Sequence, residues 1–440
     1  MKTKLFFVGI LLLSMVSYGQ EPVVQKCATT QYMEYMESKQ PGYIQATEEA
    51  FQIAKSSQEG LTHRSNETYT IPVVVHIVYA SGRPEINLDE SVILNQIQIL
   101  NEDFNRKNAD SINLRPEFLP HVGNANIKFK LAKFDPQGNP TNGITRTETT
   151  IESFLNPMEF FLGDMSSVEA VKSSATGGID PWDQSKYLNI WVCNLAVSLF
   201  GSEEIPMLMG YATPPGGLSN WPAGTTAGLS DGVVIHYSAF GSNNPNDLGA
   251  GITVKGRTTT HEVGHYLGLR HIWGDGPCGE EDGIDDTPDA TAETQGCPTN
   301  NPNSCVDNIN GVDLPNMFEN FMDYSDEDCQ NTFTAGQVAL MRGVLENQRY
   351  DLVNNEDALA IAQEDKHNIS MHPNPTYSTV TITSDENING NIRIVDVSGK
   401  IVKELEANGM EVSIDISSLQ SGIYHVYIEG HSGASKLVKL

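Results

Sequence analysis

Positive charge is scarce in this sequence. The 440 residues include 27 Lys and Arg against 56 Asp and Glu, which gives a formal net charge of −29 at pH 7. Phosphate groups would repel a chain this acidic, so we exclude nucleic acid and anionic membrane surfaces as partners. The surplus of carboxylates suits an exported protein and suits calcium binding, although solubility alone accounts for most of it.

Long apolar runs are also scarce. After the first 19 residues, no stretch approaches the roughly 18 consecutive apolar residues of a membrane span, so we expect no membrane-spanning segment there. The first residues differ, because the apolar run 5–16 follows two lysines and precedes a small-residue exit at Ser17-Tyr18-Gly19. This pattern predicts a secretory signal peptide over 1–19.

Cysteines are few, and none form a C-x-x-C pair. In an exported chain, six cysteines indicate disulfides, and a structural zinc site is the less favoured alternative. The loop 273–329 is rich in Gly, Asp, Asn and Pro, and a loop of this length needs covalent staples. The loop contains four of the six cysteines, namely Cys278, Cys297, Cys305 and Cys329. Four cysteines can pair in three different ways.

The main functional motif is the stretch from His261 to His271. His261 and His265 are four residues apart, so one helix face can present both imidazoles to a single zinc ion at about 2.0–2.1 Å. Glu262 lies beside them as the general base for water attack. Gly268 can adopt the left-handed conformation that ends the helix and turns His271 inward as the third ligand. Three protein ligands leave one position open, which indicates a catalytic site.

This motif resembles the signature of the metzincin metallopeptidases, and its surroundings resemble the pappalysin family, most closely its ulilysin-like bacterial branch. The segment Asn320 to Tyr324 matches the methionine turn of metzincins. The resemblance implies that Met322 forms a hydrophobic floor beneath the histidines and that Tyr324 donates its hydroxyl to the oxyanion. It also implies an α/β catalytic domain over 64–353, with a twisted mixed sheet and an active-site helix.

The family resemblance implies two further features of the loop after the motif. The cysteines would pair as Cys278 with Cys305 and Cys297 with Cys329. Calcium would bind the acidic stretch around Asp285-Asp286-Thr287-Pro288, with carboxylates as oxygen ligands. Simple solvation of the acidic residues is the alternative. The candidate calcium ligands are Asp282, Asp285 and Asp286.

Substrate contacts are expected on either side of the motif. In metzincins the strand before the active-site helix pairs with an extended substrate, and strand 231–237 takes that place by order, with Gly232 and Val234 as binding residues. The chain past the methionine turn forms the wall of the pocket for the residue after the scissile bond. There the resemblance makes Asp328 the partner of an Arg or Lys side chain, and the alternative is a solvated acidic turn.

Residues 20–63 have only weak helical periodicity and are predicted to be a pro-segment. Cys27 could occupy the open zinc position as a thiolate, or could instead form a disulfide with Cys193. The end of this segment reads Thr62-His63-Arg64-Ser65. An enzyme that cuts before basic residues could release itself there, so we expect Arg64 as the mature N-terminus.

Hydrophobic periodicity predicts the other elements of the catalytic domain. The expected strands cover 69–79, 127–134 and 187–193, and the expected helices cover 88–106, 166–174 and 334–352. An acidic linker, 354–367, follows.

Residues 368–440 alternate short strands with turns, which predicts a small all-β sandwich. The Pro373-Asn374-Pro375 opening, the Ser398-Gly399-Lys400 turn and the last five residues resemble the type A sorting domain of the type IX secretion system. The resemblance implies that machinery as a partner, with export through the periplasm to the medium or the cell surface. A carbohydrate-binding or adhesive module is the alternative, but no aromatic stripe suited to sugar stacking is present.

Together these patterns predict a secreted zinc endopeptidase that is made as a self-processing zymogen and acts on proteins or peptides. A surface adhesin on an inactive peptidase scaffold is the alternative, but such a scaffold has no physical need of Glu262. A zinc deacetylase would keep the metal but would not need a strand that binds extended peptide.

Overall fold

The computed structural model describes residues 24–58, 67–198, 204–216, 230–249, 251–354, 370–396, 400–428 and 435–440. The predicted signal peptide, the junction at His63 and Arg64 and nearly all of the predicted linker lie outside these residues. The chain divides into two compact units, Met1–Leu359 and Ala360–Leu440. Within the described ranges, no helix has both the length and the apolar character that a membrane crossing requires.

The first unit is built on a mixed six-stranded sheet with the order β2-β1-β4-β8-β7, and β3 also pairs with β1. The strands are β1 (Tyr69–Ala80), β2 (Ile127–Leu131), β3 (Ile144–Thr149), β4 (Leu188–Cys193), β7 (Gly210–Ala212) and β8 (Val233–His236). All pairings are parallel except that of β7 with β8. The interior of β1 is buried on both faces, which explains its nearly continuous run of β-branched residues. The predicted mixed α/β fold is confirmed.

Three helices pack with the sheet around the main core: α4 (Glu90–Asp103), α7 (Arg257–Tyr266) and α8 (Ala335–Glu346). Helix α4 starts at Asp89, whose side chain accepts a hydrogen bond from the Ser91 N–H. Helix α8 starts with a capping box between Thr334 and Gln337. The single helix predicted over 334–352 is interrupted at Asn347 and resumes as α9 (Tyr350–Val353).

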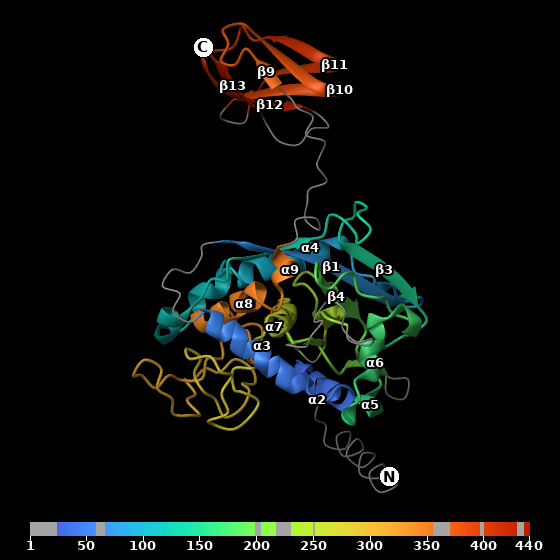
Figure 1. Ribbon diagram of the computed structural model, residues 1–440, viewed down its shortest axis with the longest axis vertical. Coiled ribbons are helices and arrows are strands. Elements are labelled where there is room, and N and C mark those ends of the chain that lie inside the picture. Colours follow the sequence, from blue (N-terminus) through green and yellow to red (C-terminus); the bar gives the residue numbers. More distant parts are fainter. Residues whose placement is uncertain are drawn as a thin grey trace. The chain divides into compact units, whose positions relative to one another are not determined.

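The predicted pro-segment contains two helices, α2 (Thr29–Lys39) and α3 (Tyr43–Gln58), which form a diagonal band beside α7 in this view (Figure 1). Their buried side chains pack into the cores of the catalytic part, with Tyr32, Met36 and Tyr43 in one cluster and Phe51 and Ala54 in another. Much of the apolar face of each helix is therefore buried only while the helix is docked on the rest of the unit.

Short elements complete the first unit. They are η1 (Pro84–Ile86), η2 (Ala109–Asn113), η3 (Pro116–His121), α5 (Pro157–Phe161), α6 (Ser166–Glu169), η4 (Ala170–Lys172), η5 (Ser174–Thr176), β5 (Ala196–Ser198), β6 (Glu204–Pro206) and η6 (Tyr237–Ala239). The helix predicted over 166–174 is present as α6 followed by η4.

The second unit is a five-stranded antiparallel arrangement around its own apolar core, which confirms the predicted small all-β domain. Its strands are β9 (Ser370–His372), β10 (Thr379–Asp396), β11 (Ile401–Asp415), β12 (Gly422–Ile428) and β13 (Ser435–Lys439). Strands β10 and β11 are long and pair with each other, and their register shifts between Thr383 and Ile388 and again between Ile394 and Val395.

Candidate active site

Three imidazoles converge at the end of α7. His261 and His265 lie on one face of that helix, and the chain then turns at Gly268, whose φ is +92°, to bring in His271. The Nε2 atom of His265 lies 3.1 Å from Nε2 of His261 and 3.1 Å from Nε2 of His271. All three side chains are buried. The turn at Gly268 therefore has the role that the sequence predicted.

The opposite ring nitrogens are all engaged. Nδ1 lies 2.7 Å from the Phe321 carbonyl in His261, 2.8 Å from the Leu269 carbonyl in His265 and 2.6 Å from Asp275 Oδ1 in His271. Carbonyl oxygens only accept hydrogen bonds, so in His261 and His265 the ring proton is on Nδ1 and the Nε2 lone pair faces the shared centre.

This donor set fits a metal ion. Nitrogens about 2.0–2.1 Å from a tetrahedral zinc ion would be about 3.3–3.4 Å apart, close to the separation found here. Burial and the neighbouring His271 lower the pKa of His265 to about 3, so the ring stays neutral, as a ligand must be. Three neutral lone pairs facing one point repel one another unless a cation lies between them.

Glu262 faces the same centre and is fully buried. Its Oε2 atom accepts a hydrogen bond from Thr29 Oγ1 at 3.1 Å and lies 3.5 Å from Cys27 Sγ, while Oε1 has no hydrogen-bond partner. Burial raises the pKa of Glu262 to about 8. The carboxylate is thus placed to hold and release a proton.

Cys27 of the pro-segment lies among the imidazoles. Its Sγ atom and ligand nitrogens of His261, His265 and His271 all lie within 4.8 Å of one another. Burial, together with the Glu262 carboxylate, raises the pKa of the thiol. Cys27 and Cys193 are both free, so the alternative of a disulfide between them is wrong.

The methionine turn lies directly under the histidines. Met322 is fully buried, and a Cβ atom at Gly264 would come 2.5 Å from its sulfur, so this close packing requires glycine in α7. The Tyr324 ring lies 4.9 Å from the His271 ring, and its hydroxyl donates a hydrogen bond to the Cys27 carbonyl at 3.1 Å. A carbonyl group therefore already occupies the position facing the predicted oxyanion donor.

The prediction that Gly232 and Val234 border the substrate cleft is wrong. Strand β8 pairs with β4 on one side and with β7 on the other, so it has no free edge. The edge strand is β7, where Gly210 lies so close to Glu262 that an added Cβ would be 3.0 Å from its Cγ. The sequence did not reveal β7, because a three-residue strand is too short to show alternation.

The pro-segment occupies this edge. Gln25 donates its N–H to the Met207 carbonyl at 3.0 Å and accepts from the Met209 N–H at 2.9 Å. The Ala28 N–H donates to the Gly210 carbonyl at 3.0 Å. The bridge between Gln25 and Leu208 is parallel, so the pro-segment runs in the same direction as β7.

The acidic turn past Tyr324 also contacts the pro-segment, through Lys26. Lys26 Nζ donates to the Tyr324 carbonyl at 2.6 Å and the Ser325 carbonyl at 2.9 Å, and lies 3.3 Å from Asp326 Oδ1. Asp328 instead pairs with Lys255 at 3.1 Å. The contact with Lys26 is thus made by Asp326, and the assignment of Asp328 to the substrate pocket stays a prediction.

The three predicted calcium ligands do not converge through their carboxylates. Asp282 is buried, with Oδ1 bonded to Thr287 and Oδ2 without a hydrogen-bond partner. Asp285 pairs with Lys55 and its side chain is 89 % exposed. Asp286 accepts hydrogen bonds from the Thr334 hydroxyl and the Gly336 N–H, and thereby caps α8. Calcium binding at this loop therefore stays a prediction.

Both disulfides implied by the family resemblance are confirmed. Cys278 is bonded to Cys305 and Cys297 to Cys329. The second bridge joins the acidic loop to the residue that follows Asp328, so it restrains the turn that contacts Lys26.

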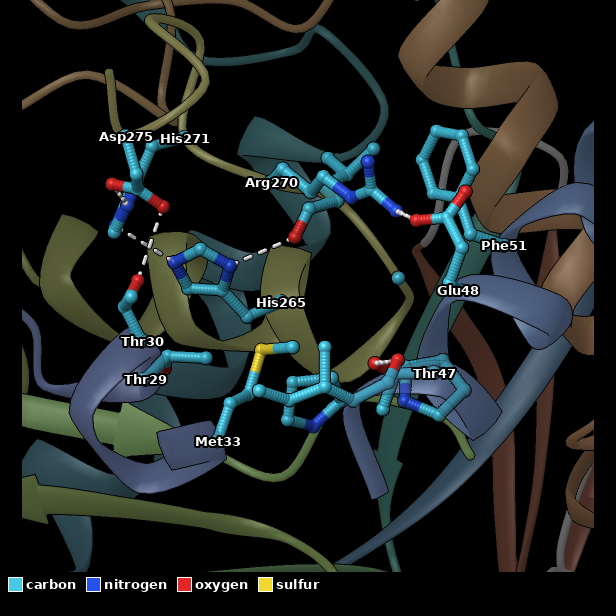
Figure 2. A pocket seen from close by; sticks show the side chains of 15 residues that line it. Thr29, Thr30, Met33, Thr47, Glu48, Phe51, His265, Arg270, His271 and Asp275 are labelled. Carbon is cyan, nitrogen blue, oxygen red and sulfur yellow. Dashed lines mark hydrogen bonds and ion pairs between the residues drawn. The ribbon is translucent and has the colours of Figure 1, made fainter. Parts of the chain in front are cut away.

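A cavity of about 190 Å³ lies between α2, α3 and the chain from His265 to Asp275. Figure 2 shows Thr29, Thr30 and Met33 on its pro-segment side, opposite His265. On the other side of the view, Glu48 of α3 is paired with Arg270, and the Arg270 guanidinium lies 4.0 Å from the Phe51 ring centroid. Residues of α2 and α3 therefore form much of the lining of this cavity.

Two protein-family models match the chain. A model described as pregnancy-associated plasma protein-A matches residues 176–346, and a secretion system C-terminal sorting domain matches residues 370–440.

The curated relatives include an extracellular metalloprotease of Verticillium alfalfae, which is 31 % identical over 292 residues, or 66 % of this chain and 80 % of that protein. Extracellular metalloprotease 1 of Coccidioides posadasii is 27 % identical over 305 residues, covering 68 % of this chain and 84 % of that protein.

Two solved structures from Tannerella forsythia are similar to this chain. Mature mirolysin in complex with a cleaved peptide is 42 % identical, with a TM-score of 0.54 over 66 % of this chain and 97 % of that chain. A promirolysin mutant is 38 % identical, with a TM-score of 0.58 over 76 % of this chain and 96 % of that chain.

Proposed function

The chain belongs to the pappalysin family of metallopeptidases, and on that premise we propose that it is a self-processing zinc endopeptidase that cuts peptide bonds on the amino side of Arg or Lys. It is a metalloendopeptidase with a type IX sorting domain, and it acts outside the cell or at the cell surface. The observation that supports the zinc chemistry best is the convergence of three Nε2 atoms beside the buried carboxylate of Glu262.

The proposed ligands of the zinc ion are His261, His265 and His271. When bound, zinc supplies a Lewis acid that polarises the peptide carbonyl and lowers the pKa of water. Glu262 takes a proton from the attacking water while the water oxygen forms a bond to the carbonyl carbon. It then gives that proton to the departing amine as the C–N bond breaks. The Tyr324 hydroxyl donates a hydrogen bond to the oxyanion, as it does to the Cys27 carbonyl in the precursor.

Latency is proposed to come from residues 20–63. Cys27 would supply a fourth zinc ligand as a thiolate. The Thr29 hydroxyl donates a hydrogen bond of 3.1 Å to the Glu262 carboxylate, which would otherwise bind the attacking water. The same segment uses the hydrogen-bonding edge of β7 that an extended substrate needs. Release would follow a cut between His63 and Arg64.

Specificity for basic residues is proposed to come from Asp326. In the precursor this carboxylate lies 3.3 Å from Lys26, one residue from Cys27. An Arg or Lys side chain after the scissile bond would take the place of Lys26, with the two backbone carbonyls of Tyr324 and Ser325 as further acceptors.

We propose the domain division 20–63 for the pro-segment, 64–353 for the catalytic domain, 354–367 for the linker and 368–440 for the sorting domain. Calcium also remains a proposal. The buried Asp282 has an unpartnered Oδ2, and backbone carbonyls of the surrounding loop would have to supply most of the remaining oxygens.

Metal content and peptide cleavage, measured on the processed enzyme and on Glu262→Ala, test the central proposal. We expect the variant to keep about one zinc per chain, because all three imidazoles remain, and to lose at least about 10³-fold in kcat because the base is gone. A zinc-loaded Glu262→Ala enzyme with full activity would refute the proposed role of Glu262.

A further inference from the structure

Lys172 is buried among aromatic rings away from the three histidines. Its side chain is 1 % exposed, and Nζ lies 4.8 Å from the ring centroid of Tyr211, 5.0 Å from that of Tyr32 and 5.7 Å from that of Trp191. Nζ also pairs with Glu169 at 2.7 Å. A buried ammonium group is stabilised by such ring faces, and it stabilises the rings in turn.

The pro-segment covers this cluster with a ring of its own. Tyr32 belongs to α2, is fully buried and lies with its ring centroid 5.5 Å from that of Tyr211. Tyr43 of α3 packs edge-on against Tyr32 at 6.3 Å. When the pro-segment leaves, one aromatic side chain is therefore removed from a site whose other members belong to the catalytic domain.

The remaining members are held by contacts within the catalytic domain. The Tyr211 hydroxyl donates to Glu169 at 2.6 Å, and the same carboxylate pairs with Lys172. Trp191 Nε1 donates to the Ile179 carbonyl at 3.0 Å. None of these contacts involves the pro-segment, so we expect the site to keep its shape after processing.

The site lies beside the proposed cleft. Tyr211 is the central residue of β7, between Gly210, which packs against Glu262, and Ala212, whose N–H donates to Thr29 Oγ1 at 2.9 Å. Neighbouring residues of a strand point to opposite faces, so the Tyr211 ring points away from Glu262. The chain of the pro-segment reaches this ring within one helical turn of Thr29.

The order of the pro-segment gives the side of the scissile bond. Lys26 lies against Asp326, Cys27 lies among the histidines, and Tyr32 follows at the aromatic site. If the Asp326 pocket receives the residue after the scissile bond, the aromatic site lies on the other side of the metal. It then faces residues that precede the scissile bond.

We propose that Tyr211, Lys172 and Trp191 form a subsite of the processed enzyme that binds an aromatic side chain on the amino side of the scissile bond. This inference rests on the proposed function. Tyr32 fills the subsite in the precursor, and a Tyr, Phe or Trp of the substrate fills it during catalysis. The ring stacks on Tyr211 and presents its face to the ammonium group.

The first test uses peptides with Arg after the scissile bond and alanine elsewhere, in which Tyr replaces one alanine at a time on the amino side. At one position, kcat/KM should rise about five- to tenfold over alanine. Pentafluorophenylalanine at that position should lose most of this gain, because fluorination reverses the ring quadrupole that attracts a cation. Leucine at that position separates the aromatic contribution from simple hydrophobic burial.

A binding measurement makes the test independent of turnover. The processed enzyme is inactivated with phenanthroline, and calorimetry compares the best tyrosine peptide with its alanine counterpart. We expect about five- to tenfold tighter binding of the tyrosine peptide. In Tyr211→Leu, the affinities for the tyrosine and alanine peptides should become about equal. Tyr211→Phe keeps the ring and should retain most of the preference for the tyrosine peptide.

Equal binding and cleavage of tyrosine and alanine peptides at every amino-side position would overturn the proposal. In that case cleavage before arginine would still support the proposed function. Conversely, an enzyme that cuts none of the peptides but still binds the tyrosine peptide more tightly would support the aromatic subsite and contradict the proposed peptidase specificity.

Discussion

Cys27 determines the latency of the precursor in our proposal, because its thiol lies among the three imidazoles and its carbonyl accepts from Tyr324. Cys27→Ala should raise the peptidase activity of the freshly purified precursor by about tenfold or more, since losing a metal ligand costs more than about 1.4 kcal/mol. The measurement is cleavage of a fluorogenic peptide before processing.

Cys193→Ala is the matched control, because this second thiol is buried in β4. Its precursor should remain latent. A Cys27→Ala precursor that is as inactive as the control would mean that docking of α2 and α3 suffices for latency.

Asp326 and Asp328 offer a test of which carboxylate selects basic residues. Asp326→Asn should lower the preference for Arg over Leu after the scissile bond by about tenfold, a modest factor because the side chain is 51 % exposed. Asp328→Asn should change that preference little, because Asp328 pairs with Lys255. The two kcat/KM ratios decide, and the opposite ranking would restore the sequence-based assignment.

At the level of elements, Glu327 connects the acidic turn past Tyr324 to helix α7. One carboxylate oxygen accepts from the Lys255 N–H and from the Arg257 N–H at 3.1 Å, and the other accepts from the Thr258 N–H at 2.8 Å and its hydroxyl at 2.9 Å. These donors are at the N-terminus of α7, where a negative charge is favourable.

Glu327→Gln should lower the free energy of unfolding by about 1–2 kcal/mol, because it removes the charge and one acceptor from the helix start. Thermal unfolding measures the loss, and Glu281→Gln, at an exposed position of the acidic loop, is the control. An unfolding midpoint equal to that of the control would show that the charge of Glu327 contributes nothing to α7.

The elements that the sequence predicted are those with local signals. The spacing from His261 to His271 determines which side chains share a helix face, and Gly268 marks where the helix ends, so this geometry was predictable. Strand β7 has three residues and no pattern, and only its pairing with β8 makes it a strand. The choice between Asp326 and Asp328 likewise depends on Lys26 and Lys255, which are distant in sequence.

At the scale of the whole molecule, the two compact units have separate apolar cores. Removing residues 360–440 should therefore leave the thermal unfolding midpoint and peptidase activity of the first unit unchanged, because none of its core residues is lost. Export should fail, because these residues contain the whole sorting domain. Calorimetry of the truncated protein and its distribution between cells and medium are the measurements. A fall in the midpoint would reveal that the second unit stabilises the first.

The parallel course of residues 25–28 along β7 has a consequence for inhibitor design. A substrate that runs antiparallel to β7 presents its scissile carbonyl to the attacking water in the orientation that catalysis needs. A parallel chain offers the same hydrogen-bonding groups, but its peptide bonds run in the opposite direction past the water. A short peptide that copies the segment Lys26-Cys27-Ala28-Thr29 should therefore bind without being consumed. Its side chains already match the acidic turn, the histidines and Glu262, so it is a natural starting point for a stable antagonist of the enzyme.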